Sequence, residues 1–148
     1  MAVVAALVAA GLAAACALEL RAFPDGELLA RIPLAHDNRF ALRYMHSVTL
    51  RPIESRYQVN AQTAAIVQVA ELFDQHGPGM ATHLAPGERL DTVRDANGVR
   101  FVMTMARPIE RLVVRVQRLP GQTLVTQGRS LELIRFGERA LELKPECM

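Results

Sequence analysis

Apolar and polar residues alternate in short runs along most of this chain, and Gly or Pro separates one run from the next. The clearest run is Phe40–Val48, where one side-chain set consists of Phe40, Leu42, Tyr44, His46 and Val48. No segment sustains the roughly 3.6-residue period of a helix. Strand-length runs with turns between them are typical of a sandwich or barrel. The sequence therefore predicts an all-β fold: a single antiparallel β-sandwich or barrel-like domain of about 8–10 short strands.

Local signals refine this prediction at several places. Ala64–Phe73 fits neither period cleanly, and its β-branched residues favour a strand with a bulge over a helix. Asp95–Gly98 reads DANG, a hairpin signal. Arg129–Phe136 and Ala140–Leu143 are predicted to form a last hairpin. Asp74–Gly87 is rich in Gly and Pro and is predicted to be a long loop, which in a compact domain is often functional or mobile.

The N-terminal segment has the composition of an export signal. Ala2–Leu18 carries no charge and is shorter than a comfortable membrane span. Ala13–Ala15 fits an A-x-A cleavage pattern, and the following Cys16 is a candidate for lipid attachment. Three outcomes remain open: cleavage, lipidation at Cys16, or retention as an anchor, the last including a buried N-terminal helix. We expect residues 1–18 to be the signal peptide or membrane anchor, 19–148 to be one β domain, and the protein to be periplasmic or otherwise extracytoplasmic.

Two cysteines stand near the ends of the chain, Cys16 and Cys147. Processing after Ala15 keeps Cys16, whereas cleavage after Ala17 removes it and leaves Cys147 unpaired. This distribution predicts neither a disulfide framework nor a cysteine-based metal site.

Charge and motifs exclude several functions. The net charge of +2 is not concentrated in a basic cluster, so we expect no nucleic-acid partner and a membrane contact only through the N-terminal segment. No G-x-S-x-G elbow occurs, which argues against a serine hydrolase. The histidines have no recognised ligand spacing, so neither a metal site nor a cofactor is predicted.

Among the residues of the chain, the side chains best suited to ligand binding or acid–base chemistry are those of His46, Ser47 and Glu54. Side chains alternate between the two faces of a strand, and this parity places His46 on the inner face. There it is either a buried imidazole bonded to backbone or carboxylate, or a site residue. Ser47 points to the opposite face, so the two cannot form a nucleophilic dyad unless the strand ends between them. Parity also puts Glu54 outward, where it would pair with Arg43 or Arg56, unless the turn at Pro52 brings it to His46.

Two further features complete the candidate site. Gly77 and Gly79 flank Pro78 in a loop where the backbone can approach a ligand closely, although a tight turn would look the same. Several arginines crowd the same region of the sequence, and they either lie on a solvated sheet face or capture a carboxylate with their planar guanidinium groups. These arginines are Arg39, Arg43, Arg51 and Arg56.

Three motifs carry a resemblance to a known family. They are FALRYMHSV at 40–48, PIESRY at 52–57 and ELFDQHGPGM at 71–80. With them the chain resembles domain-of-unknown-function family 1850, small exported bacterial proteins that look like compact β domains. Family members are often encoded beside TRAP transporters of the TAXI type, which implies a role accessory to the uptake of small organic acids. The family's signature residues map onto His46, Ser47, Glu54, Gly77 and Gly79.

The resemblance and the residues together favour a non-enzymatic, exported accessory or ligand-binding domain of a TRAP-type transporter. Its partner would be the permease or the substrate-binding protein, and no catalytic residue is predicted. One alternative is a small exported metal-assisted hydrolase using His46 and Glu54 as ligands or acid/base groups. The other is a purely structural domain in which a contact between these two residues locks the fold.

Overall fold

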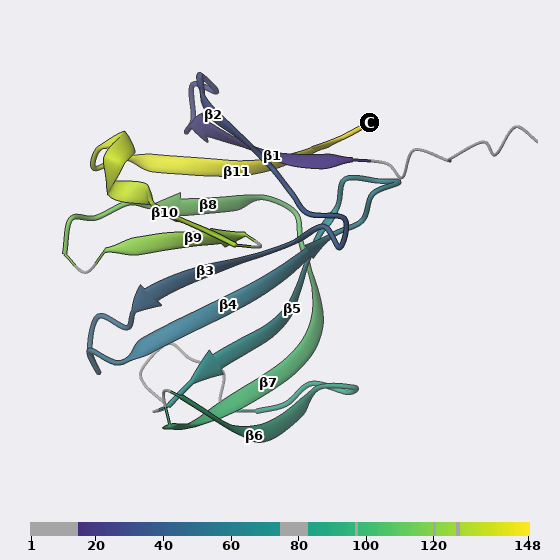
Figure 1. Ribbon diagram of the computed structural model, residues 1–148, viewed down its shortest axis with the longest axis vertical. Coiled ribbons are helices and arrows are strands. Elements are labelled where there is room, and N and C mark those ends of the chain that lie inside the picture. The colour runs from purple at the N-terminus through teal and green to yellow at the C-terminus, as the bar shows by residue number, and fades with distance from the viewer. Residues whose placement is uncertain (1–14, 75–82, 97, 120, 127) are drawn as a thin grey trace, which may run out of the picture.

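Two antiparallel β-sheets form the protein in the computed structural model (Figure 1), which describes residues 15–74, 83–96, 98–119, 121–126 and 128–148. The first strands are β1 (Cys16–Ala22), β2 (Leu28–Pro33), β3 (Arg39–Met45), β4 (Pro52–Val59) and β5 (Ile66–Phe73). They are followed by β6 (Arg89–Asp95), β7 (Gly98–Ile109), β8 (Leu112–Arg115), β9 (Gln122–Thr126) and β10 (Arg129–Glu132). A 3-10 helix, η1 (Leu133–Phe136), leads to β11 (Ala140–Cys147).

Within the described residues the strands divide into a four-stranded sheet, β2-β1-β11-β8, and a seven-stranded sheet, β10-β9-β3-β4-β5-β7-β6. The two sheets pack as a sandwich, so the predicted all-β class and sandwich architecture are confirmed. In this part of the chain no helix is both long and apolar enough to cross a membrane.

The main core lies between the two sheets. Alternate residues of the first and last strands point into it, so that Leu18, Leu20, Leu141 and Leu143 are almost completely buried. The seven-stranded sheet contributes Phe40 and other residues from its inner face. Burying a leucine side chain completely stabilises the fold by roughly 1.5–3 kcal/mol. The pairing of β1 with β11 is therefore required for the core and not only for the sheet.

The predicted bulge and hairpin are both present. β5 pairs with β7 through a register shift between Gln68 and Ala70, as expected of the stretch that fitted neither period. β6 and β7 form a hairpin in which Asp95 pairs with Gly98. Gly98 has φ of 100°, a conformation that a residue with a Cβ rarely adopts. The loop predicted at 74–87 is described only in part.

The predicted last hairpin is wrong. β10 pairs with β9, the next residues form η1, and β11 crosses to the other sheet, where it pairs with β1 and β8. Leu133 is fully buried in η1, and Leu141 is fully buried in β11. Two adjacent apolar runs therefore contribute to one core from η1 and from a strand of the other sheet, and not as the two strands of one hairpin.

The sequence predicts no disulfide framework, and the structure corrects this expectation. Cys16 and Cys147 lie directly opposite each other in the β1–β11 register and form a disulfide with a Cα–Cα distance of 4.1 Å. The two residues are separated by 131 positions, so only the tertiary pairing of the first and last strands brings them together.

Candidate functional site

His46 and Ser47 lie in the loop that joins β3 to β4. The strand ends at Met45, so His46 does not continue the inner face as parity predicted. The loop is closed by backbone bonds in which His46 N–H donates to the Arg51 carbonyl, and Leu50 N–H donates to the His46 carbonyl, both at 2.9 Å. Leu50 has φ of 55°, which allows this reversal and is unusual for a large side chain.

The imidazole of His46 organises this loop. Its Nδ1 accepts hydrogen bonds from the backbone N–H groups of Val48 and Thr49, each at 3.3 Å. In a loop, neighbouring side chains need not point to opposite faces, so strand alternation does not separate His46 from Ser47. Nδ1 of His46 is already occupied by the two amides. The bond to backbone that was one predicted role of His46 is therefore present, although the ring is only half-buried.

Glu54 lies on the outer face of the seven-stranded sheet, as its parity predicted. The β3–β4 register places it opposite Arg43. Nε of Arg43 donates to Oε2 of Glu54, and Nε of Arg56 donates to Oε1, both at 2.7 Å. Both predicted arginine partners are thus engaged at once, and the turn at Pro52 does not turn Glu54 toward His46. Glu54 is 6% exposed, because the arginine side chains lie over it.

The charge of Glu54 is fixed by these two arginines. Burial acts to raise the pKa of its carboxyl, but the hydrogen bonds and positive charges of Arg43 and Arg56 outweigh burial and hold the pKa below its usual value. Glu54 is therefore an anion at neutral pH. A carboxylate bound by two guanidinium groups is a poor general base, so its role is to position the arginines.

A cavity of about 360 Å³ opens on this face, and we call it the arginine pocket. It is lined by Arg43, Pro52, Ile53, Glu54, Arg56, Asp74 and Arg100. Arg100 reaches it from β7 because β4, β5 and β7 are consecutive in the sheet. Phe73 pairs with Phe101 in the antiparallel register of β5 and β7. Asp74 and Arg100 are the chain neighbours of these two residues on the same side of the pair, so both face the opposite, outer side of the sheet.

Unused hydrogen-bond donors belong to residues that line this pocket. Nε of Arg100 is buried and has no hydrogen-bond partner, although its Nη2 pairs with Asp95. Among the described residues, the terminal nitrogens of Arg43 and Arg56 also have no acceptor. A buried donor without an acceptor is costly, about 1–3 kcal/mol, and such donors in native proteins are commonly satisfied by a ligand or water.

Asp74 forms one side of the pocket and is held by Arg51. Nε of Arg51 donates to Oδ1 and Oδ2 of Asp74 at 3.1 and 3.0 Å, and its Nη2 makes a further short contact. The Arg51 hydrogen bonds hold the pKa of Asp74 below its usual range. The lining residues therefore carry three positive charges against two negative charges, and the pocket favours an anion.

A separate polar cluster lies on the inner face of the same sheet. It contains Tyr44, Ser55 and Tyr57, and Ser55 lies where it can hydrogen-bond to both phenols. Burial raises the pKa of both tyrosines, to about 12 for Tyr57, more than Ser55 lowers it. These phenols are neutral at physiological pH and cannot serve there as bases.

Of the other predicted site residues, neither His46 nor Ser47 lines the arginine pocket. Gly77 and Gly79 lie outside the described residues. Ser47 is exposed in the β3–β4 loop. In the described part of the chain, no three His, Cys, Asp or Glu residues come together in a group that could hold a metal ion. Sequence reasoning singled out Arg43, Glu54 and Arg56 but missed Arg100, since only the strand order places β7 beside this site.

The fold and pocket define a class: a small all-β sandwich domain with an arginine-lined pocket on the outer face of its larger sheet. The chain belongs to the family described as Domain of unknown function (DUF1850), whose model matches residues 40–133, more than half of the 148 residues. The match confirms the resemblance and includes every lining residue of the pocket. No curated protein matches the chain, and no solved structure matches it.

Proposed function

We propose that this protein is an exported, non-enzymatic domain that binds a small organic acid and assists a TRAP-type transporter of the TAXI class in its uptake. The observation that supports it best is the buried Nε–H of Arg100, which has no acceptor and belongs to a pocket with a net positive lining. The signal-like N-terminal segment supports export. The association with a transporter rests on the family resemblance.

A carboxylate is the ligand chemistry that suits this pocket best. Guanidinium groups bind carboxylates through paired N–H donors, and Arg43 and Arg56 each keep terminal nitrogens for such a contact. Glu54 occupies only their Nε groups, so it holds both arginines in place without using their outer edges. A ligand carboxylate between these edges and Arg100 would meet donors from β3, β4 and β7.

The affinity of such a site depends on restraint of the arginines. Arg43 and Arg56 have side chains that are 56% and 48% exposed, so free arginines at these positions would lose rotamer entropy on binding. Their bonds to Glu54 remove part of that freedom before the ligand arrives. Preorganisation of this kind raises affinity by lowering the entropic cost of binding.

Calorimetric titration of the purified protein with acetate and succinate, at matched ionic strength with chloride as the reference anion, tests ligand binding. We expect saturable binding of at least one carboxylate and a loss of about tenfold in affinity for Arg100→Gln, equivalent to one charge-assisted hydrogen bond. Arg89→Gln is the matched control, because Arg89 lies on β6, pairs with Asp91 and does not line the pocket. Equal losses in both variants would contradict the pocket's role.

Uptake by intact cells tests the transporter association separately. In this proposal, uptake of an organic acid by the partner TRAP system should fall when the gene for this protein is deleted, and wild-type protein should restore it better than Arg100→Gln. The permease or substrate-binding protein should also co-purify with the wild type. Unchanged uptake in the deletion strain would refute the transporter role while leaving carboxylate binding to be judged by calorimetry.

A further inference from the structure

We propose that the mature protein keeps Cys16 and uses its sulfur for a structural disulfide with Cys147, formed after export, rather than for attachment of a lipid. This proposal uses the extracytoplasmic location proposed above but does not depend on the ligand. Both cysteines lie outside residues 40–133, so the family match does not include them.

The backbone holds the two cysteines face to face at the edge of the core. Cys16 and Cys147 are partners in the β1–β11 register, and their Cα atoms are 4.1 Å apart. The Met148 N–H donates to the Ala15 carbonyl at 3.1 Å, and the Leu34 N–H donates to the Cys16 carbonyl at 2.9 Å. Neighbouring strands thus fix Cys16 from both sides, and its sulfur is directed to Cys147.

The surroundings of Cys16 argue against a lipid on its sulfur. Cys16 is only 3% exposed and belongs to the same core as Leu18 and Leu20. Diacylglyceryl on its Sγ would need this end of β1 to leave the core. Cysteine sulfur forms one further covalent bond beyond Cβ, so a thioether to lipid and a bond to Cys147 exclude each other.

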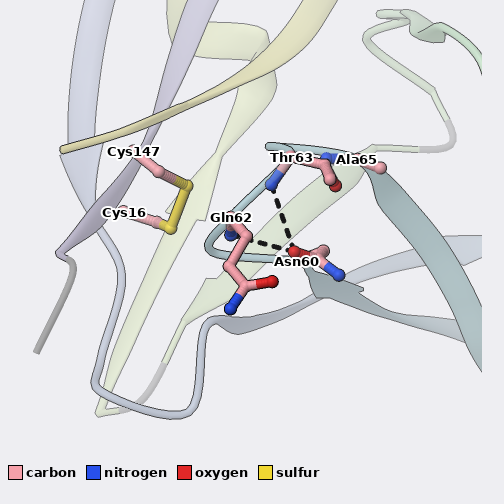
Figure 2. The surroundings of a disulfide bond; sticks show 6 residues. All are labelled: Cys16, Asn60, Gln62, Thr63, Ala65 and Cys147. Carbon is pink, nitrogen blue, oxygen red and sulfur yellow. Dashed lines mark hydrogen bonds between the residues drawn. A yellow bond between two sulfur atoms is a disulfide. The ribbon is translucent and has the colours of Figure 1, made fainter.

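A turn between β4 and β5 packs beside the disulfide, as Figure 2 shows. Oδ1 of Asn60 accepts hydrogen bonds from the backbone N–H groups of Gln62 and Thr63 at 2.9 and 3.1 Å. Backbone bonds between Asn60 and Ala65, and between Ala64 and Asn60, close the turn. This ordered turn belongs to the seven-stranded sheet, so the disulfide lies where both sheets meet and closes that end of the sandwich.

The core also restricts processing. Cleavage after Ala17 would remove Cys16 and Ala17, which are two paired residues of β1, whereas cleavage after Ala15 leaves β1 whole from Cys16 onward. Of the two cleavage sites that the sequence offers, only the one after Ala15 is compatible with the disulfide. Retention of the N-terminal segment is compatible with it as well.

The oxidation requires a disulfide donor, and a thiol–disulfide oxidoreductase of the export compartment supplies the chemistry. The Cys16 thiolate attacks one sulfur of the donor disulfide, forming a mixed disulfide and releasing the donor's other sulfur as a thiolate. The Cys147 thiolate then attacks the Cys16 sulfur and releases the second donor thiolate. The protein loses two electrons and two thiol protons, and the donor disulfide becomes a dithiol.

Intact-mass spectrometry of the full chain, expressed with its own N-terminus in an export-competent bacterium and extracted with detergent, tests the proposal. Maleimide is added before or after reduction under denaturing conditions. We expect no label before reduction, two labels after it, no acyl mass, and an N-terminus at Cys16 or upstream. As a labelling control, Cys147→Ser should take up one label without reduction.

Three results would overturn the proposal: an acylated Cys16, a mature chain that begins after Ala17, or two thiols that react without reduction. Each is read from the wild-type protein, so poor folding of a variant cannot obscure the answer. Carboxylate binding plays no part in these measurements, and the disulfide proposal stands or falls independently of the ligand.

Discussion

Replacement of Glu54 by Gln removes the buried charge that holds two arginines on the outer face. Glu54 is 6% exposed and accepts a charge-assisted hydrogen bond from Arg43 and another from Arg56, both at 2.7 Å. Bonds of this kind contribute about 1.5–3 kcal/mol each when desolvated. The arginines are about half exposed, so solvent screening reduces the sum, and Gln retains one acceptor oxygen. We expect a loss of roughly 2 kcal/mol in the free energy of unfolding.

Urea denaturation followed by circular dichroism measures this loss, and thermal unfolding should show a Tm lower by about 6–8 °C for a domain of this size. The pH dependence provides a second readout. Because the pKa of Glu54 is held below its usual value, its contribution is complete above the unfolded-state pKa and is lost as pH falls through the lowered folded-state pKa. The gap between wild type and Glu54→Gln should therefore narrow in acid.

Glu138→Gln is the matched control, since Glu138 is mostly exposed and its contact with Arg118 is longer, at 3.4 Å. We expect it to change the free energy of unfolding by no more than about 0.5 kcal/mol. If Glu54→Gln were no more destabilising than Glu138→Gln, the arginines would not be held by Glu54, and the pocket would not be preorganised.

Three other substitutions test the fold, the first of them with a matched control. Leu18→Ala, at a fully buried position, should cost about 2–5 kcal/mol in urea denaturation, whereas Leu28→Ala, at an exposed position of β2, should cost far less. Cys147→Ser should cost about 2–5 kcal/mol, and its difference from wild type should shrink when both are measured in reductant. His46→Ala should cost about 1 kcal/mol and accelerate hydrogen exchange of the two loop amides that its Nδ1 accepts, and unchanged exchange would refute the loop-organising role.

The sequence predicts most of the strands because their signals are local. Alternation identifies strands such as β3 and β4, and the mixed pattern of Ala64–Phe73 indicates the bulge that β5 contains. Parity also places Glu54 on the outer face correctly and suggests its two arginine partners. These predictions need only the period of a strand and the identities of its neighbours in the chain.

The errors come from long-range pairing. β11 is an alternating run that follows another apolar run in the chain, and this local pattern predicts a hairpin between the two. The actual partners of β11 are β1 and β8. The Cys16–Cys147 disulfide follows from the same pairing and could not be inferred from spacing. The sequence also gives no signal that β3 ends at Met45, so the alternation of side chains wrongly assigns His46 to the inner face of that strand.

The site shows the same division between local and tertiary information. Arg43, Glu54 and Arg56 lie on paired neighbouring strands and could be associated from the sequence. Arg100 and Asp74 enter the pocket only through the order β4-β5-β7, which no local pattern determines. The fraction of a site that can be predicted therefore depends on how many of its residues share one hairpin.

Carboxylate binding in the arginine pocket is tested most directly by titrating isotope-labelled protein with succinate and following the side-chain Nε–H resonances of its arginines. Binding in the arginine pocket predicts a saturable shift of the Arg100 Nε–H signal, which is the buried donor without an acceptor, together with smaller shifts at Arg43 and Arg56. Arg89, which is exposed and outside the pocket, should not shift. An Arg100 signal that stays unchanged at high succinate concentration, or one that moves no more than that of Arg89, would contradict carboxylate binding in the arginine pocket.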